Sequence, residues 1–221
     1  MAYIDDFIAH PRTFMRNNIV IVNSTCNDYL SGKRDFTLKK IESMNGVSPE
    51  GTNMDVYSLR PHEGVGTIVE AFWCQYKKNA HLGVSLPGDS TAKLMFTFAM
   101  DGCTLATGSR TDGGGCMAHH VNCAEAGAAA KAWGEDAAAE QQRKLQRNIA
   151  SSIVSNGSNV DPDDYMDPEK LPVPIPAGAK ISTNTFGRLA QGNVWKFYTH
   201  QWYTVQGSRT NLRFIGSHRV I

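Results

Sequence analysis

The hydrophobic residues of the chain occur in short runs bounded by glycine, proline and polar residues. NNIVIVN at 17–23 is one such run, and DVYSLRPHEGVGTIVEAFWC at 55–74 contains two around a glycine-containing turn. KNAHLGVSLPGDST at 78–91 has the pattern of a strand and a loop. Runs of this length, rich in β-branched and aromatic residues, predict strands rather than helices.

A hairpin is predicted in the next part of the chain. AKLMFTFAM at 92–100 is apolar and rich in strand-forming residues, and Asp-Gly follows it directly. Because Asp-Gly is a frequent turn dipeptide between paired strands, CTLATG at 103–108 is expected to return as the partner strand. This hairpin places Cys103 at a strand end beside a tight turn.

One long helix is predicted between Cys123 and about Val154, where alanine, glutamate, glutamine and lysine dominate. Asn122 is suited to cap it. Gly127 and Gly134 each weaken the first half by roughly 1 kcal/mol relative to alanine, so the prediction applies mainly to the second half.

The segment at about 155–178 is polar, acidic and rich in proline, which predicts a loop. Its aspartates lack the glycine turn and terminal glutamate of an EF-hand, so we expect a solvated loop rather than a calcium site. These residues are Asp161, Asp163, Asp164 and Asp167.

The C-terminal part predicts an antiparallel meander, because the segments 179–190, 193–205 and 211–221 are rich in β-branched and aromatic residues and are separated by breaks. The expected fold class is α+β. We predict a single domain over residues 1–221, with a mixed or antiparallel β-sandwich flanked by helices.

The composition is ordinary for a globular protein. Of 221 residues, 41% are hydrophobic, and 22 basic against 21 acidic side chains leave a net charge of +1. This balance gives no reason to expect nucleic acid or an anionic membrane as a partner.

The first residues lack the parts of a signal peptide, and no apolar run approaches the roughly 18 residues of a spanning helix. Five cysteines, an odd number, fit reduced thiols better than a disulfide framework.

Residues with reactive or metal-binding side chains concentrate in the segment 94–123, LMFTFAMDGCTLATGSRTDGGGCMAHHVNC. A thiol at a turn after a buried strand is held rigidly, and the backbone amides of Gly102 and Cys103 are suited to bind a developing oxyanion. His119 and His120 follow Cys103 by 16 and 17 residues, so a returning strand would bring one imidazole beside the thiol. Only one can meet it, because neighbours on a strand face opposite ways. Thr97 is a candidate to orient that imidazole.

A zinc site is an alternative use of the same segment. Soft or borderline ligands lie within eight residues, although so short a segment rarely closes one tetrahedron. The four candidates are Cys116, His119, His120 and Cys123. A plain buried strand is a further alternative, because a cysteine after an apolar strand is most often inert.

Two further classes of protein stay open. A papain-like cysteine peptidase would use the same thiol and imidazole, but in such enzymes the cysteine and histidine are separated by far more than the 16 residues between Cys103 and His119. A non-enzymatic protein-binding module would present the aromatic residues of WKFYTHQWYTV at 195–205 as an interaction face. Strand alternation puts Trp195, Phe197 and Thr199 on one side, which favours packing in the core.

MFTFAMDGCTLATG followed by DGGGCMAHHV resembles the active-site region of the glutamine deamidase toxins, the group of Burkholderia lethal factor and the catalytic domain of the cytotoxic necrotizing factors. The Gly-Gly and Met-Ala-His elements are also similar to the Cys-His region of the bacterial chemoreceptor glutamine deamidases. The resemblance covers about 30 of the 221 residues. It implies a deamidase-toxin-like fold, with Cys103 as the nucleophile, His119 as the base, Thr97 as the orienting residue and His120 as the alternative base.

The sequence departs from the family at one position beside the nucleophile. The family's Leu-Ser-Gly-Cys is Met100-Asp101-Gly102-Cys103 here, so a carboxylate replaces a serine. A negative charge beside the thiol would raise its pKa unless the carboxylate faces solvent.

By this resemblance the chain is expected to be a protein glutamine deamidase, a hydrolase acting as a toxin or injected effector with no cofactor. Attack of the thiolate on a glutamine side chain would give glutamate and ammonia, or transglutamination when an amine replaces water. The implied partner of a monomeric enzyme is a host protein, such as a Rho-family GTPase or a translation-initiation RNA helicase. The soluble chain would be made in the bacterial cytoplasm without a cleaved signal peptide and delivered into the host cytosol.

Overall fold

The computed structural model describes residues 2–109, 114–125, 134–154, 157–167, 170–177 and 179–220. The first half of the predicted helix, with Gly127, and part of the loop before His119 lie outside the described residues.

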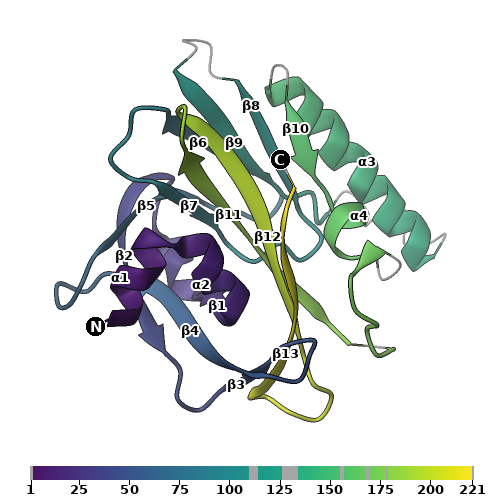
Figure 1. Ribbon diagram of the computed structural model, residues 1–221. Coiled ribbons are helices and arrows are strands. Elements are labelled where there is room, and N and C mark those ends of the chain that lie inside the picture. The colour runs from purple at the N-terminus through teal and green to yellow at the C-terminus, as the bar shows by residue number, and fades with distance from the viewer. Residues whose placement is uncertain are drawn as a thin grey trace.

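Figure 1 shows the arrangement of the helices and strands. The helices are α1 (Ala2–Ala9), α2 (Pro11–Asn17), α3 (Glu135–Ile153) and α4 (Pro162–Tyr165), with a 3₁₀ helix η1 at Ser24–Asp28. The strands are β1 (Asn18–Val22), β2 (Gly32–Lys40), β3 (Asn45–Val47), β4 (Asn53–Pro61), β5 (Val69–Cys74), β6 (His81–Pro87), β7 (Leu94–Thr97), β8 (Thr104–Ser109), β9 (Gly115–Val121), β10 (Ser158–Val160), β11 (Ile181–Ala190), β12 (Val194–Thr204) and β13 (Asn211–Arg219).

The larger sheet closes into a barrel. Its strands follow the order β4-β2-β5-β7-β11-β12-β13-β3, and β3 pairs back with β4 to complete an eight-stranded ring. β1 pairs in parallel with β4. The predicted α+β class is confirmed, but the predicted sandwich is wrong, because the short strand β3 joins β13 to β4 and closes the ring of eight strands.

The barrel interior is filled by aromatic side chains and by the N-terminal helices. Phe7 of α1 stacks on Phe96 of β7 with ring centroids 6.1 Å apart, and Phe14 of α2 packs 5.0 Å from Tyr57 of β4. Figure 1 shows the two helices, in purple, against the barrel strands. Their apolar faces therefore belong to the barrel core, together with Trp73 of β5.

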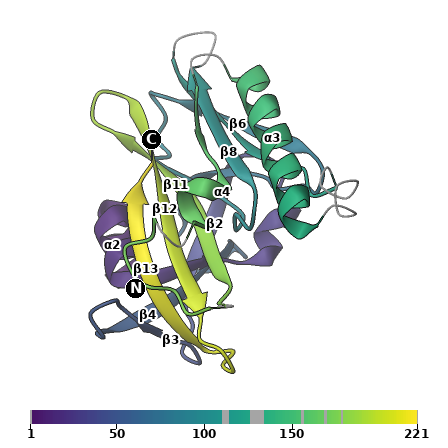
Figure 2. The same cartoon turned by 90° about the vertical axis from the view of Figure 1, so that its right-hand side faces the viewer.

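A second, four-stranded sheet of order β10-β8-β9-β6 packs against the outside of the barrel. Alternation along β5 divides the two cores, because Ala71 and Trp73 point into the barrel whereas Phe72 and Cys74 point to the smaller sheet. Helix α3 covers the other face of this sheet, where Ala150 packs in one cluster with residues of β8 and β9. Figure 2 shows α3 beside this sheet and away from the barrel helices.

The hairpin predicted across Asp101 and Gly102 is wrong. β7 pairs with β5 and β11 in the barrel, whereas β8 pairs with β9 and β10 in the smaller sheet. Gly102 does adopt the turn conformation that glycine favours, with φ of 83°, but the turn carries the chain from one sheet to the other. Both edges of β7 are taken by distant strands, so long-range pairing overrides the local turn signal.

The remaining predictions have mixed outcomes. The C-terminal meander is confirmed, since β11, β12 and β13 pair antiparallel, and Trp195 and Phe197 are buried as expected. The second half of the predicted helix forms α3. The segment predicted as a loop contains β10 and α4, and Asp161 and Asp164 form a capping box at the start of α4. Within the described part of the chain, no helix has the length and apolarity needed to cross a bilayer.

Strand β1 is fixed to the far wall of the barrel by two buried side chains. The amide of Val20 donates to Nε2 of His200 at 2.9 Å, and Nδ2 of Asn184 donates to the carbonyl of Val20 at 2.9 Å. Burial lowers the pKa of His200 to about 3, and the same cause lowers the pKa of His120 to about 3.

These two histidines predict destabilisation in acid. Between about pH 6.5 and pH 3 the unfolded chain binds protons that the folded protein excludes, so stability falls on acidification by roughly 1.4 kcal/mol per pH unit for each histidine. Urea unfolding at pH 7, 6 and 5 should show this slope. His200→Gln should be less stable at pH 7, because it weakens the bond to Val20, and its slope should be shallower by roughly 1.4 kcal/mol per pH unit. An unchanged slope in this variant would contradict the assignment.

Candidate active site

Thr97 and His120 meet between the two sheets. Thr97 lies at the end of β7, and its Oγ1 is 2.5 Å from Nδ1 of His120 on β9. Both side chains are buried. His120 can act as a base through Nε2 only if Nδ1 carries the proton and donates to Thr97, so this contact is suited to select the tautomer and the orientation of the ring.

Cys103 lies directly before β8, and His120 lies on β9, the strand that pairs with β8. The pairing of β8 with β9 sets Leu105 opposite His120 and Thr104 opposite Val121, and Cys103 and Asn122 are the next residues beyond that last pair. Nδ2 of Asn122 donates to the Cys103 sulfur at 3.1 Å, which fixes that contact. Continued by one residue, this register would make Cys103 and His120 diagonal neighbours on one face, a relation that puts Cα atoms roughly 7–8 Å apart in antiparallel sheets.

Tyr76 links the thiol and the imidazole. Its ring packs against His120 with centroids 5.2 Å apart, and its pKa is raised by burial and by the neighbouring Cys103 thiol group. The described hydrogen bonds include none between the Cys103 sulfur and His120, whose Nε2 is buried without a partner among the described residues. Such contacts are often long in unliganded enzymes and tighten when substrate binds.

His119 lies on the opposite face of the strand. It pairs with Gly83 and Ala106, and its imidazole covers Gly83 so closely that a Cβ added there would be 2.4 Å from the ring. The expectation that His119 meets Cys103 is wrong in geometry, because successive residues of β9 alternate between the faces. The alternative base, His120, lies on the face that contacts Thr97.

The thiol and imidazole rest in their neutral forms at neutral pH. Burial raises the pKa of Cys103 to about 11, against the opposing effect of hydrogen bonds from Asn122 and the backbone of Asp101. Burial lowers the pKa of His120 to about 3. Formation of a thiolate therefore requires loss of the thiol proton, and at these pKa values its transfer to neutral His120 is strongly unfavourable in the resting protein.

Asp101, which replaces the family's serine, faces solvent. Its carboxylate is exposed and lies 2.7 Å from Nζ of Lys180. It raises the pKa of Cys103, but burial is the larger cause of that shift. The ion pair and the exposure keep the negative charge from dominating the environment of the thiol.

The four candidate zinc ligands do not converge. Cys116 packs toward the barrel side, as does His120, whereas His119 faces away and Cys123 joins the cluster beneath α3. Across the described residues, no three histidine, cysteine or acidic side chains form a group that could hold a metal ion. Strand alternation spreads the ligands over two faces, and this arrangement does not fit a tetrahedral site.

Asn122, the residue expected to cap the predicted helix, contacts two backbone amides and the sulfur of Cys103. Its Oδ1 accepts from the amides of Asn79 at 2.9 Å and Ala124 at 3.2 Å, so Nδ2 must be the atom that points to the sulfur of Cys103. The sequence gives no signal for this contact beyond the position of Asn122 two residues after His120. The orientation of the amide is fixed by its partners.

Together these residues provide a thiol, a buried imidazole held by a hydroxyl, and an amide donor at the sulfur, which are the parts of a nucleophilic cysteine site. Comparison of the sequence with protein-family models and with curated proteins finds no match.

The contact between Asn122 and the thiol predicts a measurable pH profile. Alkylation of Cys103 by iodoacetamide, followed on its peptide by mass spectrometry, should rise with pH without reaching a plateau between pH 7 and 10, because the pKa is about 11. Asn122→Asp should slow alkylation further at each pH, since it keeps Oδ1 but replaces the donor with a negative charge.

Asn79→Asp is the matched control, because it adds the same charge in the adjoining segment without touching the sulfur. It should keep the wild-type profile to within about twofold. A plateau below pH 9 in the wild type, or equal effects of the two substitutions, would contradict the assignment.

Proposed function

We propose that the chain is a protein glutamine deamidase in which Cys103 is the nucleophile and His120 its base. The contact between His120 and Thr97 supports this most, because it occupies Nδ1 and leaves Nε2 as the nitrogen available to the thiol. The resemblance to the deamidase toxins supports the same chemistry, with His120 in place of His119.

The first step is attack on the carboxamide of a target glutamine. The proton of the Cys103 thiol passes to Nε2 of His120 as the sulfur bonds to the carboxamide carbon, and the electron pair of the C=O bond moves to the oxygen. Nδ2 of Asn122, 3.1 Å from the sulfur, and the amide of Asp101 are donors suited to the oxyanion. The resemblance adds the amides of Gly102 and Cys103.

The second step releases ammonia and restores the thiol. The imidazolium gives its proton to the departing nitrogen as the C–N bond breaks, which leaves a thioester on Cys103. His120 then takes a proton from water, whose oxygen attacks the thioester carbon; the C–S bond breaks and the proton returns to the sulfur. An amine in place of water gives transglutamination. This sequence needs no metal or organic cofactor.

The substrate must reach a covered thiol. Cys103 is only 2% exposed, and the half-buried rings of Tyr76 and Phe98 pack 5.8 Å apart beside His120. We infer that a protein substrate displaces these rings as its glutamine enters. By the resemblance, the target is a host protein such as a Rho-family GTPase or a translation-initiation RNA helicase, and the enzyme is an effector delivered into the host cytosol.

The two histidines give the sharpest test of this proposal. A eukaryotic lysate treated with the wild type should release ammonia and contain a discrete protein heavier by about one mass unit, the change from an amide to an acid. Cys103→Ser and His120→Gln should lose both signals by about 100-fold or more. His119→Gln is the matched control and should keep activity to within about threefold.

Folding of each variant is checked by circular dichroism. Activity that requires His119 but not His120 would put the base on the other face and refute the assignment. No mass shift with the wild type would refute the deamidase.

Thr97 should act through the orientation of His120. Thr97→Val keeps the shape but removes a hydrogen bond worth roughly 1–3 kcal/mol, so kcat should fall by about 10- to 100-fold with little change in KM. Thr97→Ser retains the hydroxyl and should recover most of the activity. Equal losses in both variants would indicate a packing effect instead.

A further inference from the structure

Both carbonyl groups at the nucleophile are held by side chains from distant helices. The carbonyl of Gly102 accepts from Nε2 of Gln146 at 2.8 Å and of Gln142 at 3.2 Å, both on α3. The carbonyl of Cys103 accepts from the hydroxyl of Tyr165 on α4 at 2.6 Å. A short loop thus receives three side-chain donors.

The two strongest of these donors are themselves fixed. Gln146 is fully buried, and its Oε1 accepts from the hydroxyl of Thr104 at 3.3 Å, which sets the orientation of the amide. Tyr165 is also fully buried, and its backbone carbonyl accepts from Nε2 of Gln201 on β12 at 2.8 Å. The loop is therefore tied to the smaller sheet, to α3 and to the barrel wall.

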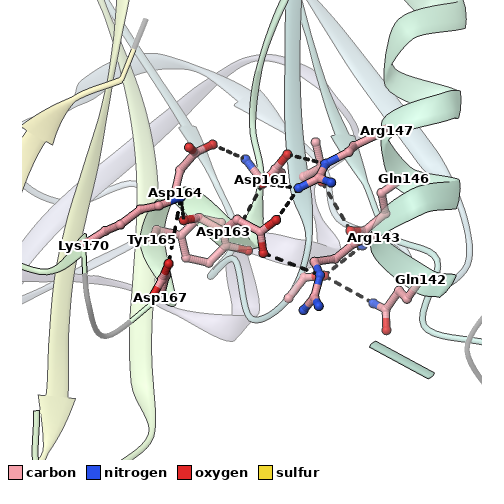
Figure 3. A network of polar contacts seen from close by, with 12 residues as sticks. Gln142, Arg143, Gln146, Arg147, Asp161, Asp163, Asp164, Tyr165, Asp167 and Lys170 are labelled. Carbon is pink, nitrogen blue, oxygen red and sulfur yellow. Dashed lines mark hydrogen bonds and ion pairs between the residues drawn. The ribbon is translucent and has the colours of Figure 1, made fainter. Parts of the chain in front are cut away.

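Figure 3 shows how α3 and α4 are joined. Arg147 binds Asp161 through Nε at 2.8 Å and also contacts Asp163, and Arg143 lies 3.5 Å from Asp163. Exposed ion pairs are individually weak, but these share partners in one network. Because i and i+4 positions lie on one side of a helix, α3 holds the loop with Gln142 and Gln146 and holds α4 with Arg143 and Arg147.

These contacts fix the direction of a backbone amide. In a planar trans peptide the C=O and N–H point opposite ways, and the described residues contain no cis bond. The carbonyl of Gly102 points to α3, so the N–H of Cys103 points away from α3. Gly102, with φ of 83°, permits this conformation.

We propose that Gln146 and Tyr165 are positioning residues that hold the peptide planes on either side of Cys103, so that its amide is aimed as an oxyanion donor. The role of the amide rests on the proposed deamidase, whereas the restraint on the loop does not. Loss of either donor should loosen the loop, expose the thiol and misplace the amide.

The test compares Gln146→Leu and Tyr165→Phe with two matched controls. Gln142→Leu removes the weaker donor to the same carbonyl, and Tyr198→Phe removes a hydroxyl from a buried tyrosine of the barrel. Alkylation of Cys103 in the folded protein at pH 8 is measured on its peptide. The alkylation of Cys26, which is buried in the barrel, reports global unfolding in the same samples.

We expect Cys103 alkylation to rise at least fivefold in Gln146→Leu and Tyr165→Phe and less than twofold in the controls, with Cys26 unchanged. Deamidation should fall at least tenfold in kcat with KM changed less than twofold. Faster chemical modification with slower catalysis distinguishes a positioning role from a general loss of stability. Parallel increases at Cys103 and Cys26, or no increase at Cys103, would overturn the proposal.

Failure of the proposed function would be recognised separately. If the wild type deamidates no protein, the oxyanion role of the Cys103 amide is refuted together with that function. The alkylation ratios still decide whether Gln146 and Tyr165 restrain the loop. If the wild type is active and the variants keep its kcat, the positioning role is wrong and the deamidase stands.

Discussion

The pairing of β7 on both edges is the constraint on which the site depends. Because β5 and β11 take the hydrogen-bonding groups of β7, the chain after Thr97 cannot fold back as a hairpin and must leave the barrel. It crosses in six residues to begin the smaller sheet at Thr104. The crossing leaves Thr97 in the barrel and brings Cys103 to the start of the smaller sheet, whose His120 contacts Thr97, so the site is a product of sheet packing rather than of one continuous strand.

Burial is the dominant force on the ionisable groups of this site. The packing that holds the thiol and imidazole also removes both from water, and the two pKa shifts act in opposite directions to keep the pair neutral. A neutral pair places no charge in a region of low dielectric, where an unpaired charge would be costly. The covered thiol and the proposed displacement of Tyr76 are consistent with such a resting state.

Local signals in the sequence were sufficient to predict many elements and insufficient to predict how they meet. The apolar runs of β1, β5 and β12 and the helical composition of α3 identify those elements, because strand and helix periods are properties of neighbouring residues. The three-residue strand β3 that closes the barrel has too little pattern to detect. Asn122 and Tyr165 reach Cys103, and Gln146 reaches Gly102, from separations of 19 to 62 residues, which no local period encodes.

The orientation of the two adjacent histidines, His119 and His120, is reflected in the packing of Gly83 on the face of the smaller sheet opposite His120. Gly83 leaves a notch on β6 that the imidazole of His119 fills, and any side chain there would collide with it. A slip of β9 by one residue would exchange the faces of the two histidines and would leave that notch without its ring. Gly83 therefore fits the register in which His119 faces β6 and His120 faces Thr97 of the barrel.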